Sequence, residues 1–96
     1  MKPYVKILGV DYKVEFPEDV NDDGLLRLIN YNTMTIKVKR DLPEHAQKKV
    51  LIHECVHAML EILKLNELND DEDLVDKLAC GILSIVENNP FLADIS

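Results

Sequence analysis

The chain has 96 residues, 47% of them hydrophobic and 30% charged, which excludes a disordered chain and predicts one domain spanning residues 1–96. Its net charge of −7 argues against nucleic acid as a partner, because the phosphates would repel it. No apolar run is long enough to cross a membrane, and residues 1–4 lack the apolar core of a signal peptide. We therefore expect a cytoplasmic protein with no membrane partner, and with Cys55 and Cys80 as buried free thiols.

The first part of the chain has the pattern of β-hairpins. Tyr12, Val14 and Phe16 alternate with charged residues, which predicts a strand that buries these three side chains. A β-rich run over residues 4–8 precedes this strand, and residues 9–11 predict the turn between the two.

A second hairpin is predicted from residues 25–31 and 34–39, which join near Asn32 and follow a turn at residues 21–24. Its second strand would place three apolar side chains on the inward face: Met34, Ile36 and Val38.

The rest of the chain has the apolar spacing of two helices. The first is predicted from Pro43 to about Lys64, and the second from Asp70 or Asp71 to about Glu87, with residues 66–70 as their connection. This order of elements predicts an α+β fold, in which a small antiparallel sheet of about four strands is followed by two long antiparallel helices. The second helix would then begin beside the C-terminal half of the first.

The first predicted helix contains the segment His53-Glu54-Cys55-Val56-His57, an H-E-x-x-H motif. Two histidines at i and i+4 lie on one helical face, one turn apart, so both imidazoles can bind one metal ion. Glu54 projects beside that ion, where it can accept a proton from a metal-bound water. The alternative is a helix whose two histidines only pack or face solvent.

A catalytic zinc site usually has three protein ligands and one open position, so the motif needs a third ligand. Leu60 and Leu63 stand where an extended H-E-x-x-H-x-x-G-x-x-H motif has its Gly and its third His, which excludes that class. Cys80 is expected to lie too far along the second helix. The remaining candidate is the acidic run of residues 70–73, which begins the second helix at about the required place.

Within this run we choose Glu72 as the ligand, because Asp76 follows it at i+4 on the same helical face. Glu72 would bind the metal, and Asp76 would accept the other N–H of a ligating histidine and so fix its tautomer. The alternative is that the acidic run only complements the helix dipole and remains in water, which we expect for some of its members.

These residues resemble a known family. The motif, followed by Glu72-x-x-Val75-Asp76-x-Leu78-Ala79, is similar to the H-E-x-x-H … E-x-x-A-N/D-x-F-A pattern of the ImmA/IrrE-type zinc metallopeptidases, a gluzincin-like arrangement. The approach to the motif, residues 36–54, also resembles the small members that phages and mobile elements encode.

The resemblance covers roughly residues 24–83, and the H-E-x-x-H part is its most specific element. It implies His53, His57 and Glu72 as zinc ligands, Glu54 as the catalytic acid/base, and Asp76 at the position that is Asn or Asp in the family. Val75 and Leu78 replace the usual Ala and Phe with other apolar residues.

We therefore expect a metallopeptidase with one Zn²⁺ per chain, which hydrolyses peptide bonds through a zinc-bound water with Glu54 as general acid/base. Its partner would be a protein or peptide substrate, bound by strand addition to a sheet edge such as residues 34–39. The candidates for an additional donor to the oxyanion are Tyr31, Tyr12 and His45.

Two other functions remain open at this point. One is a zinc-binding regulatory or protein-interaction module, which keeps the H-E-x-x-H site with little or no proteolytic activity. The other is a helical interaction domain that binds no metal.

Overall fold

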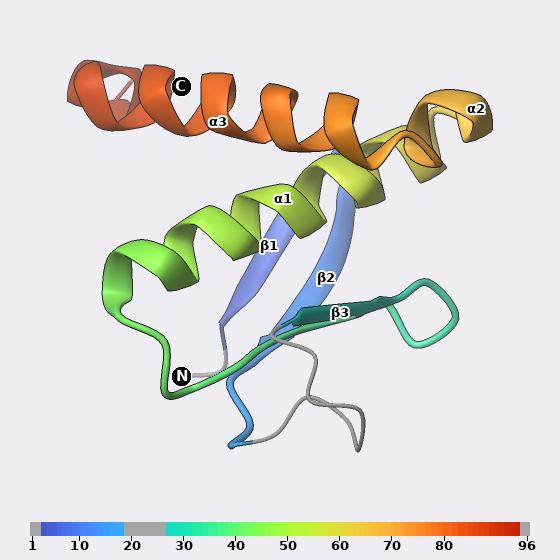
Figure 1. Ribbon diagram of the computed structural model, residues 1–96, viewed down its shortest axis with the longest axis horizontal. Coiled ribbons are helices and arrows are strands. Elements are labelled where there is room, and N and C mark those ends of the chain that lie inside the picture. The colour runs from blue at the N-terminus through green and yellow to red at the C-terminus, as the bar shows by residue number, and fades with distance from the viewer. Residues whose placement is uncertain (1–2, 19–26, 95–96) are drawn as a thin grey trace.

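A computed structural model of the protein describes residues 3–18 and 27–94 (Figure 1). The elements, in chain order, are β1 (Tyr4–Ile7), β2 (Val10–Glu15), β3 (Arg27–Asn30), β4 (Thr35–Val38), α1 (Glu44–Ile62), α2 (Asn66–Asn69), α3 (Glu72–Asn88) and the 3-10 helix η1 (Pro90–Asp94). Four strands precede the helices, so the predicted α+β class is confirmed. The predicted turn at residues 21–24 and the first two residues of the second hairpin, 25–26, lie outside the described residues.

The four strands form one mixed sheet in the order β1-β2-β4-β3. The β1–β2 and β3–β4 pairs are antiparallel, as predicted, whereas β2 and β4 run parallel, with Val14 opposite Ile36. The expectation of an antiparallel sheet throughout was therefore wrong at its central pair. The alternation of side chains determines which face of a strand is buried, but it carries no information on the direction of the neighbouring strand.

The helix α1 lies across one face of this sheet (Figure 1). The core between them contains Tyr12, Ile36, Val38 and Ala58, all buried. Ala58 comes from α1, and the positions of Tyr12 on β2 and of Ile36 and Val38 on β4 explain why one face of the sheet is apolar. This core fixes the orientation of α1 and so determines which of its faces is left for α3.

Two residues predicted to point inward do not belong to this face. Phe16 follows the end of β2 and is 37% exposed. Met34 is 38% exposed, because it lies in the tight turn before β4 with a φ of +52°. A backbone in the left-handed region leaves the pleat of a strand, so the period of two does not extend to that position.

The second long helix, α3, packs on the side of α1 that faces away from the sheet. A separate apolar cluster joins the two helices and contains Val56, Leu60, Val75 and Ala79. In the described part of the chain α3 contacts α1, α2 and η1, but no strand. The two long helices cross obliquely in Figure 1 and are not clearly antiparallel, so this part of the expectation is not confirmed.

A sharp reversal at the end of α1 brings the chain back over this helix. Lys64 has a φ of +61°, and the N–H of Leu65 donates to the carbonyl of Leu60 at 2.9 Å. This left-handed residue ends the helix two residues before the predicted boundary. The expected connection at residues 66–70 contains one short helical turn, α2. As a result, α3 begins beside the C-terminal half of α1, as predicted.

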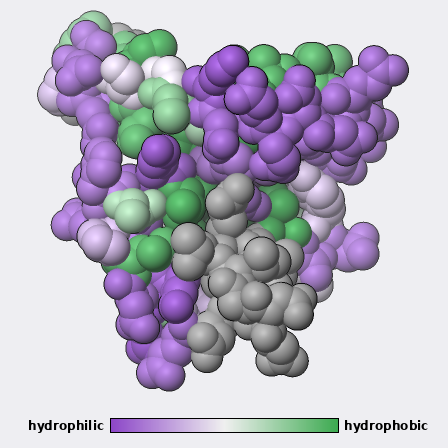
Figure 2. Space-filling model, in the orientation of Figure 1, coloured by the Kyte–Doolittle hydropathy of each residue, from purple (hydrophilic) through white to green (hydrophobic). Residues whose placement is uncertain are grey.

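Apolar side chains are exposed at the opposite end of α3 (Figure 2). Ile85, Val86 and Phe91 are 55%, 54% and 59% exposed. At 1.5 Å per residue, Ile85 and Val86 lie about 20 Å along the helix from its first residue, Glu72, and Phe91 follows in η1. No helix among residues 3–18 and 27–94 is long and apolar enough to span a membrane.

Candidate metal centre

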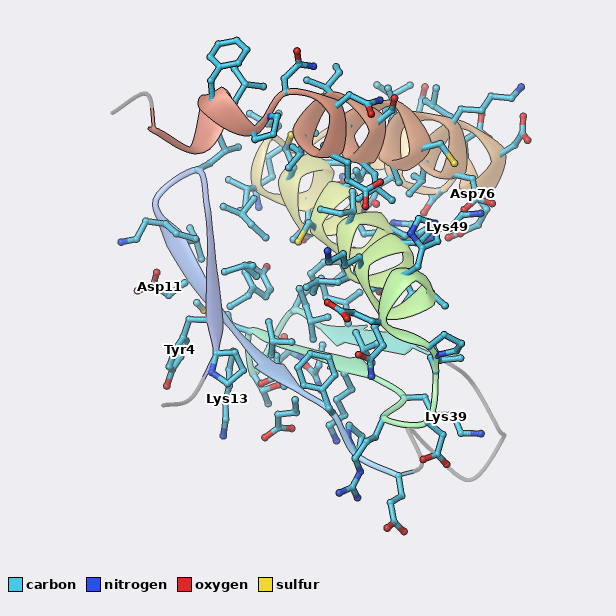
Figure 3. The ribbon with its side chains drawn as sticks, turned by 90° about the vertical axis from the view of Figure 1, so that its left-hand side faces the viewer. Tyr4, Asp11, Lys13, Lys39, Lys49 and Asp76 are labelled. Carbon is cyan, nitrogen blue, oxygen red and sulfur yellow. The ribbon has the colours of Figure 1, made fainter. Side chains whose placement is uncertain are left out.

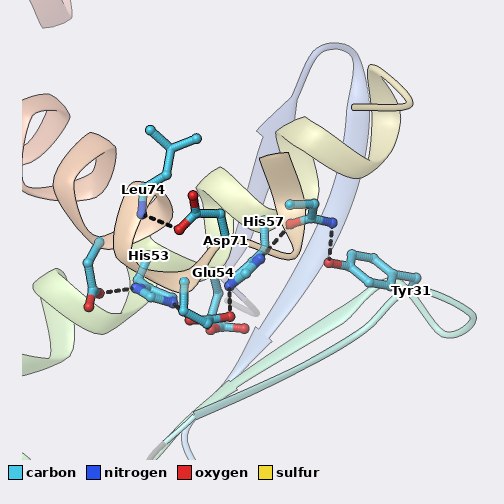
Figure 4. A network of polar contacts seen from close by, with 9 residues as sticks. Tyr31, His53, Glu54, His57, Asp71 and Leu74 are labelled. Carbon is cyan, nitrogen blue, oxygen red and sulfur yellow. Dashed lines mark hydrogen bonds and ion pairs between the residues drawn. The ribbon is translucent and has the colours of Figure 1, made fainter. Parts of the chain in front are cut away.

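His53 and His57 lie one turn apart on the face of α1 that is turned toward α3. Both are buried, with 3% and 8% of their surface exposed, and their ring centroids are 4.9 Å apart. Their positions follow from the helical period, because residues at i and i+4 share a face. The two imidazoles therefore face one small region between α1 and α3, as the motif predicted (Figure 4).

Glu72 reaches this region from the first turn of α3. One carboxylate oxygen lies 2.9 Å from Nε2 of His57, and the other lies 3.1 Å from Nε2 of His53. One ligand atom from each of the three side chains lies within 4.8 Å of the other two. His53, His57 and Glu72 thus form a group that could hold a metal ion, although 61% of the Glu72 side chain is exposed.

The second ring nitrogen of each histidine has its own partner. Asp76 accepts a hydrogen bond from Nδ1 of His53 at 2.7 Å, and Asn69 accepts one from Nδ1 of His57 at 2.5 Å. With the proton on Nδ1, each Nε2 keeps its lone pair directed toward Glu72. Two imidazole nitrogens and one carboxylate oxygen match the donor set of a catalytic zinc site, which leaves a fourth position open.

Asn69 is the residue that sequence reasoning missed. It is the last residue of α2, in a segment expected to be only a connection. Its amide group also donates to the hydroxyl of Tyr31 at 3.2 Å (Figure 4). The available signal was its position three residues before the predicted ligand Glu72, but nothing in the local periodicity distinguishes it from its neighbours.

Glu54 lies beside the three-residue group and is not one of its members. Its carboxylate is 4% exposed, and Oε1 lies 4.0 Å from Nε2 of His53. A buried carboxylate at this distance is near enough to exchange a proton with a molecule that sits between the histidines and Glu72. This is the placement that the motif predicts for a general base.

The acidic run before and within the first turn of α3 separates into different roles. Asp71 is the N-cap, and its side chain accepts from the N–H of Leu74 at 3.1 Å. Asp73 forms an exposed ion pair with Lys77 at 3.0 Å. Of these neighbours, only Glu72 points toward the histidines, because the cap fixes the rotation of the first turn.

The two cysteines are both free thiols, but only one is sheltered. Burial raises the pKa of the Cys55 thiol to about 11, and Glu54 acts in the same direction. Cys80 is exposed, which corrects the expectation that it is buried. It lines a cavity of about 280 Å³ together with Lys49, His53 and Asp76 and lies outside the metal group. Figure 3 shows Lys49 and Asp76 close together on this side of the helices.

The three candidate donors to an oxyanion differ in their positions. Tyr12 is in the core beneath α1, at 3% exposure. The side chain of His45 is 74% exposed and lies 3.9 Å from Glu87, at the far end of α1. Tyr31 alone is connected to the metal group, through Asn69.

The Tyr31 hydroxyl is held in its protonated form. Burial raises the pKa of Tyr31 above its usual value near 10, and the hydrogen bond from Asn69 opposes this shift. The nearby carboxylates of Glu61 and Glu54 raise the pKa further. Tyr31 is therefore a neutral hydrogen-bond donor at physiological pH.

In comparisons with known proteins, no family model, no curated protein and no solved structure matches this chain.

Proposed function

We propose that this protein is a zinc-dependent metallopeptidase, of the ImmA/IrrE type that its motifs resemble. The observation that carries this proposal is the placement of the Glu72 carboxylate across the Nε2 atoms of His53 and His57, beside the buried carboxylate of Glu54. Two histidines and a glutamate with an adjacent buried carboxylate are the parts that metal-assisted hydrolysis requires.

Zinc bound by this group supplies Lewis acidity toward water and toward the carbonyl of a substrate. Glu54 accepts a proton from the attacking water and returns it to the leaving amine. Asp76 and Asn69 hold the two imidazoles in the tautomer and orientation that binding needs.

The substrate in this proposal is an extended peptide segment. The sequence suggested residues 34–39 as the strand that such a segment joins, but β4 is interior, with β2 and β3 on its two sides. Among the strands that the structure describes, β1 and β3 are at the two edges of the sheet, and β3 makes the more extensive contact with α1, which carries Glu54. The outer edge of β3 is therefore the better candidate for strand addition.

A second function, a zinc-binding module without catalysis, is favoured by one observation. The side chains of Glu72 and Asp76 are 61% and 64% exposed, so the metal group is open to solvent on the α3 side. An open site offers few walls to hold a substrate and exclude water.

Replacing the proposed general base distinguishes the two functions. We expect Glu54→Gln to retain one zinc per chain and to lose cleavage of casein by about 10²-fold or more, because the amide cannot accept the proton. Zinc is measured by elemental analysis after dialysis, and cleavage by the release of fluorescent peptides.

Glu44→Gln is the matched control, because it makes the same change in the exposed first turn of the same helix. Zinc binding by the unchanged protein without any cleavage would favour the binding module. Full activity of Glu54→Gln would contradict the assigned role.

A further inference from the structure

We propose that Asn69 is a positioning residue that couples the metal ligand His57 to Tyr31 and holds the Tyr31 hydroxyl as a hydrogen-bond donor to the substrate carbonyl oxygen. This inference rests on the proposed metal-dependent function and adds two residues to its site. It follows from the two contacts of one side-chain amide.

The amide of Asn69 uses its two ends for two different tasks. Its oxygen accepts from Nδ1 of His57 at 2.5 Å, and its nitrogen donates to the oxygen of Tyr31 at 3.2 Å. A side-chain amide accepts through its oxygen and donates through its nitrogen without carrying a charge. The two contacts therefore depend on each other, since one rotation of the amide determines both.

The direction of the second contact leaves a proton available. Among the hydrogen bonds of the described residues, Tyr31 accepts from Asn69, so its own O–H can turn toward another acceptor. Asn69 does not accept this proton, because it presents its NH2 group to Tyr31 while its oxygen faces His57. The raised pKa of Tyr31 keeps the proton in place at neutral pH.

The position of Tyr31 suits a substrate held along the sheet edge. It directly follows β3, in the turn that leads to β4, and it lies on the His57 side of the metal group (Figure 4). The carboxylate of Glu54 influences its pKa, which places both groups in one electrostatic environment. A peptide paired with β3 that reached the metal group would pass beside this hydroxyl.

The partner of the other histidine shows why an amide matters at position 69. His53 donates to a carboxylate, Asp76, which has no proton to give and would draw in any nearby hydroxyl. An aspartate at position 69 would still accept from His57, but it would also accept the Tyr31 proton. Replacing the amide nitrogen with an oxygen therefore keeps the contact with His57 but removes the donor to Tyr31.

The experiment compares Asn69→Asp with Tyr31→Phe in the zinc-loaded and cobalt-loaded protein. We expect both variants to keep metal affinity within about threefold, because His57 keeps an acceptor in each. We expect both to bind acetohydroxamate about tenfold more weakly, since each removes one donor to its anionic oxygen. Metal affinity is measured by chelator competition, and hydroxamate binding by the change in the cobalt absorption spectrum.

The double variant and a matched control sharpen the comparison. Asn69→Asp combined with Tyr31→Phe should bind hydroxamate no more weakly than either single variant, because both changes remove the same donor. Asn66→Asp makes the same charge change at an exposed position of the same short helix and should behave like the unchanged protein.

Either of two outcomes would contradict the proposed coupling of His57 to Tyr31 through Asn69. Unchanged hydroxamate binding in Asn69→Asp would show that Tyr31 does not depend on the amide. A loss of metal affinity of tenfold or more in that variant would reduce Asn69 to an orienting partner of His57. These readouts need no peptide cleavage, so an inactive protein would refute the proposed peptidase function and still test this inference.

Discussion

At the scale of single residues, the parts of the site that a helical period specifies could be predicted. His53 and His57 share a face because they are four residues apart, and Asp76 was paired with Glu72 for the same reason. Tyr31 was one of three candidate donors, but Asn69 and its contact with Tyr31 could not be found in this way, because a short helix and a turn meet there only in the folded chain. Contacts between distant segments leave no period in the sequence.

The choice of Glu72 within the acidic run gives a prediction at this scale. Glu72→Ala should weaken zinc binding by about a hundredfold or more, because it removes one of the three protein donors. This loss should exceed that from removing a residue that only hydrogen-bonds a ligating histidine. Asp73→Ala should leave zinc affinity nearly unchanged, since Asp73 pairs with Lys77 in solvent. Competition with a chromogenic chelator measures both, and the reverse ranking would place the ligand at position 73.

At the scale of elements, the boundaries and faces of the long helices were predicted, but the pairing of β2 with β4 was not. Propensity and capping signals act within one element, so α3 begins beside Asp71 as expected. Strand order depends on how the connections pass over the sheet, which residues 25–39 do not specify by themselves. The strand order matters for the site because it places β3, the proposed strand for substrate pairing, at an edge of the sheet.

The N-cap of α3 provides the prediction for this scale. Asp71→Ala should lower the free energy of unfolding by about 1 kcal/mol, because the N–H of Leu74 loses its side-chain partner. It should also weaken zinc binding, since Glu72 is the first residue of the helix that the cap begins. Asp70→Ala, the same change at the last position before the cap, is the control and should stay within about 0.5 kcal/mol. Urea unfolding measures the first effect; equal losses in both variants would contradict a capping role.

At the scale of the whole molecule, the protein is built in three layers, with α1 between the sheet and α3 (Figure 1). The two apolar clusters lie on opposite sides of α1 and share none of their buried residues. In the described part of the chain, α3 contacts no strand and is joined to the sheet through α1 and through α2, whose Asn69 contacts Tyr31. The metal group bridges the same two helices as the second cluster, so bound metal should stabilise that half selectively.

Hydrogen exchange with and without metal tests this division. Removal of zinc with a chelator should speed amide exchange in α2 and α3 by about tenfold or more, and should change exchange in β2 and β4 much less. The Glu72→Ala variant, treated in the same way, is the control and should show little further change. A uniform increase across sheet and helices would mean that the molecule opens as one unit.

The edge position of β3 sets a limit on what could be cleaved. A segment can pair with a free strand edge only while its own main-chain N–H and C=O groups are unoccupied, so helices and interior strands of folded proteins are poor candidates. Proline lacks the N–H and would interrupt the pairing. Under the proposed function, locally unfolded, proline-poor stretches are therefore the substrates, selected by the accessibility of their backbone more than by side-chain identity.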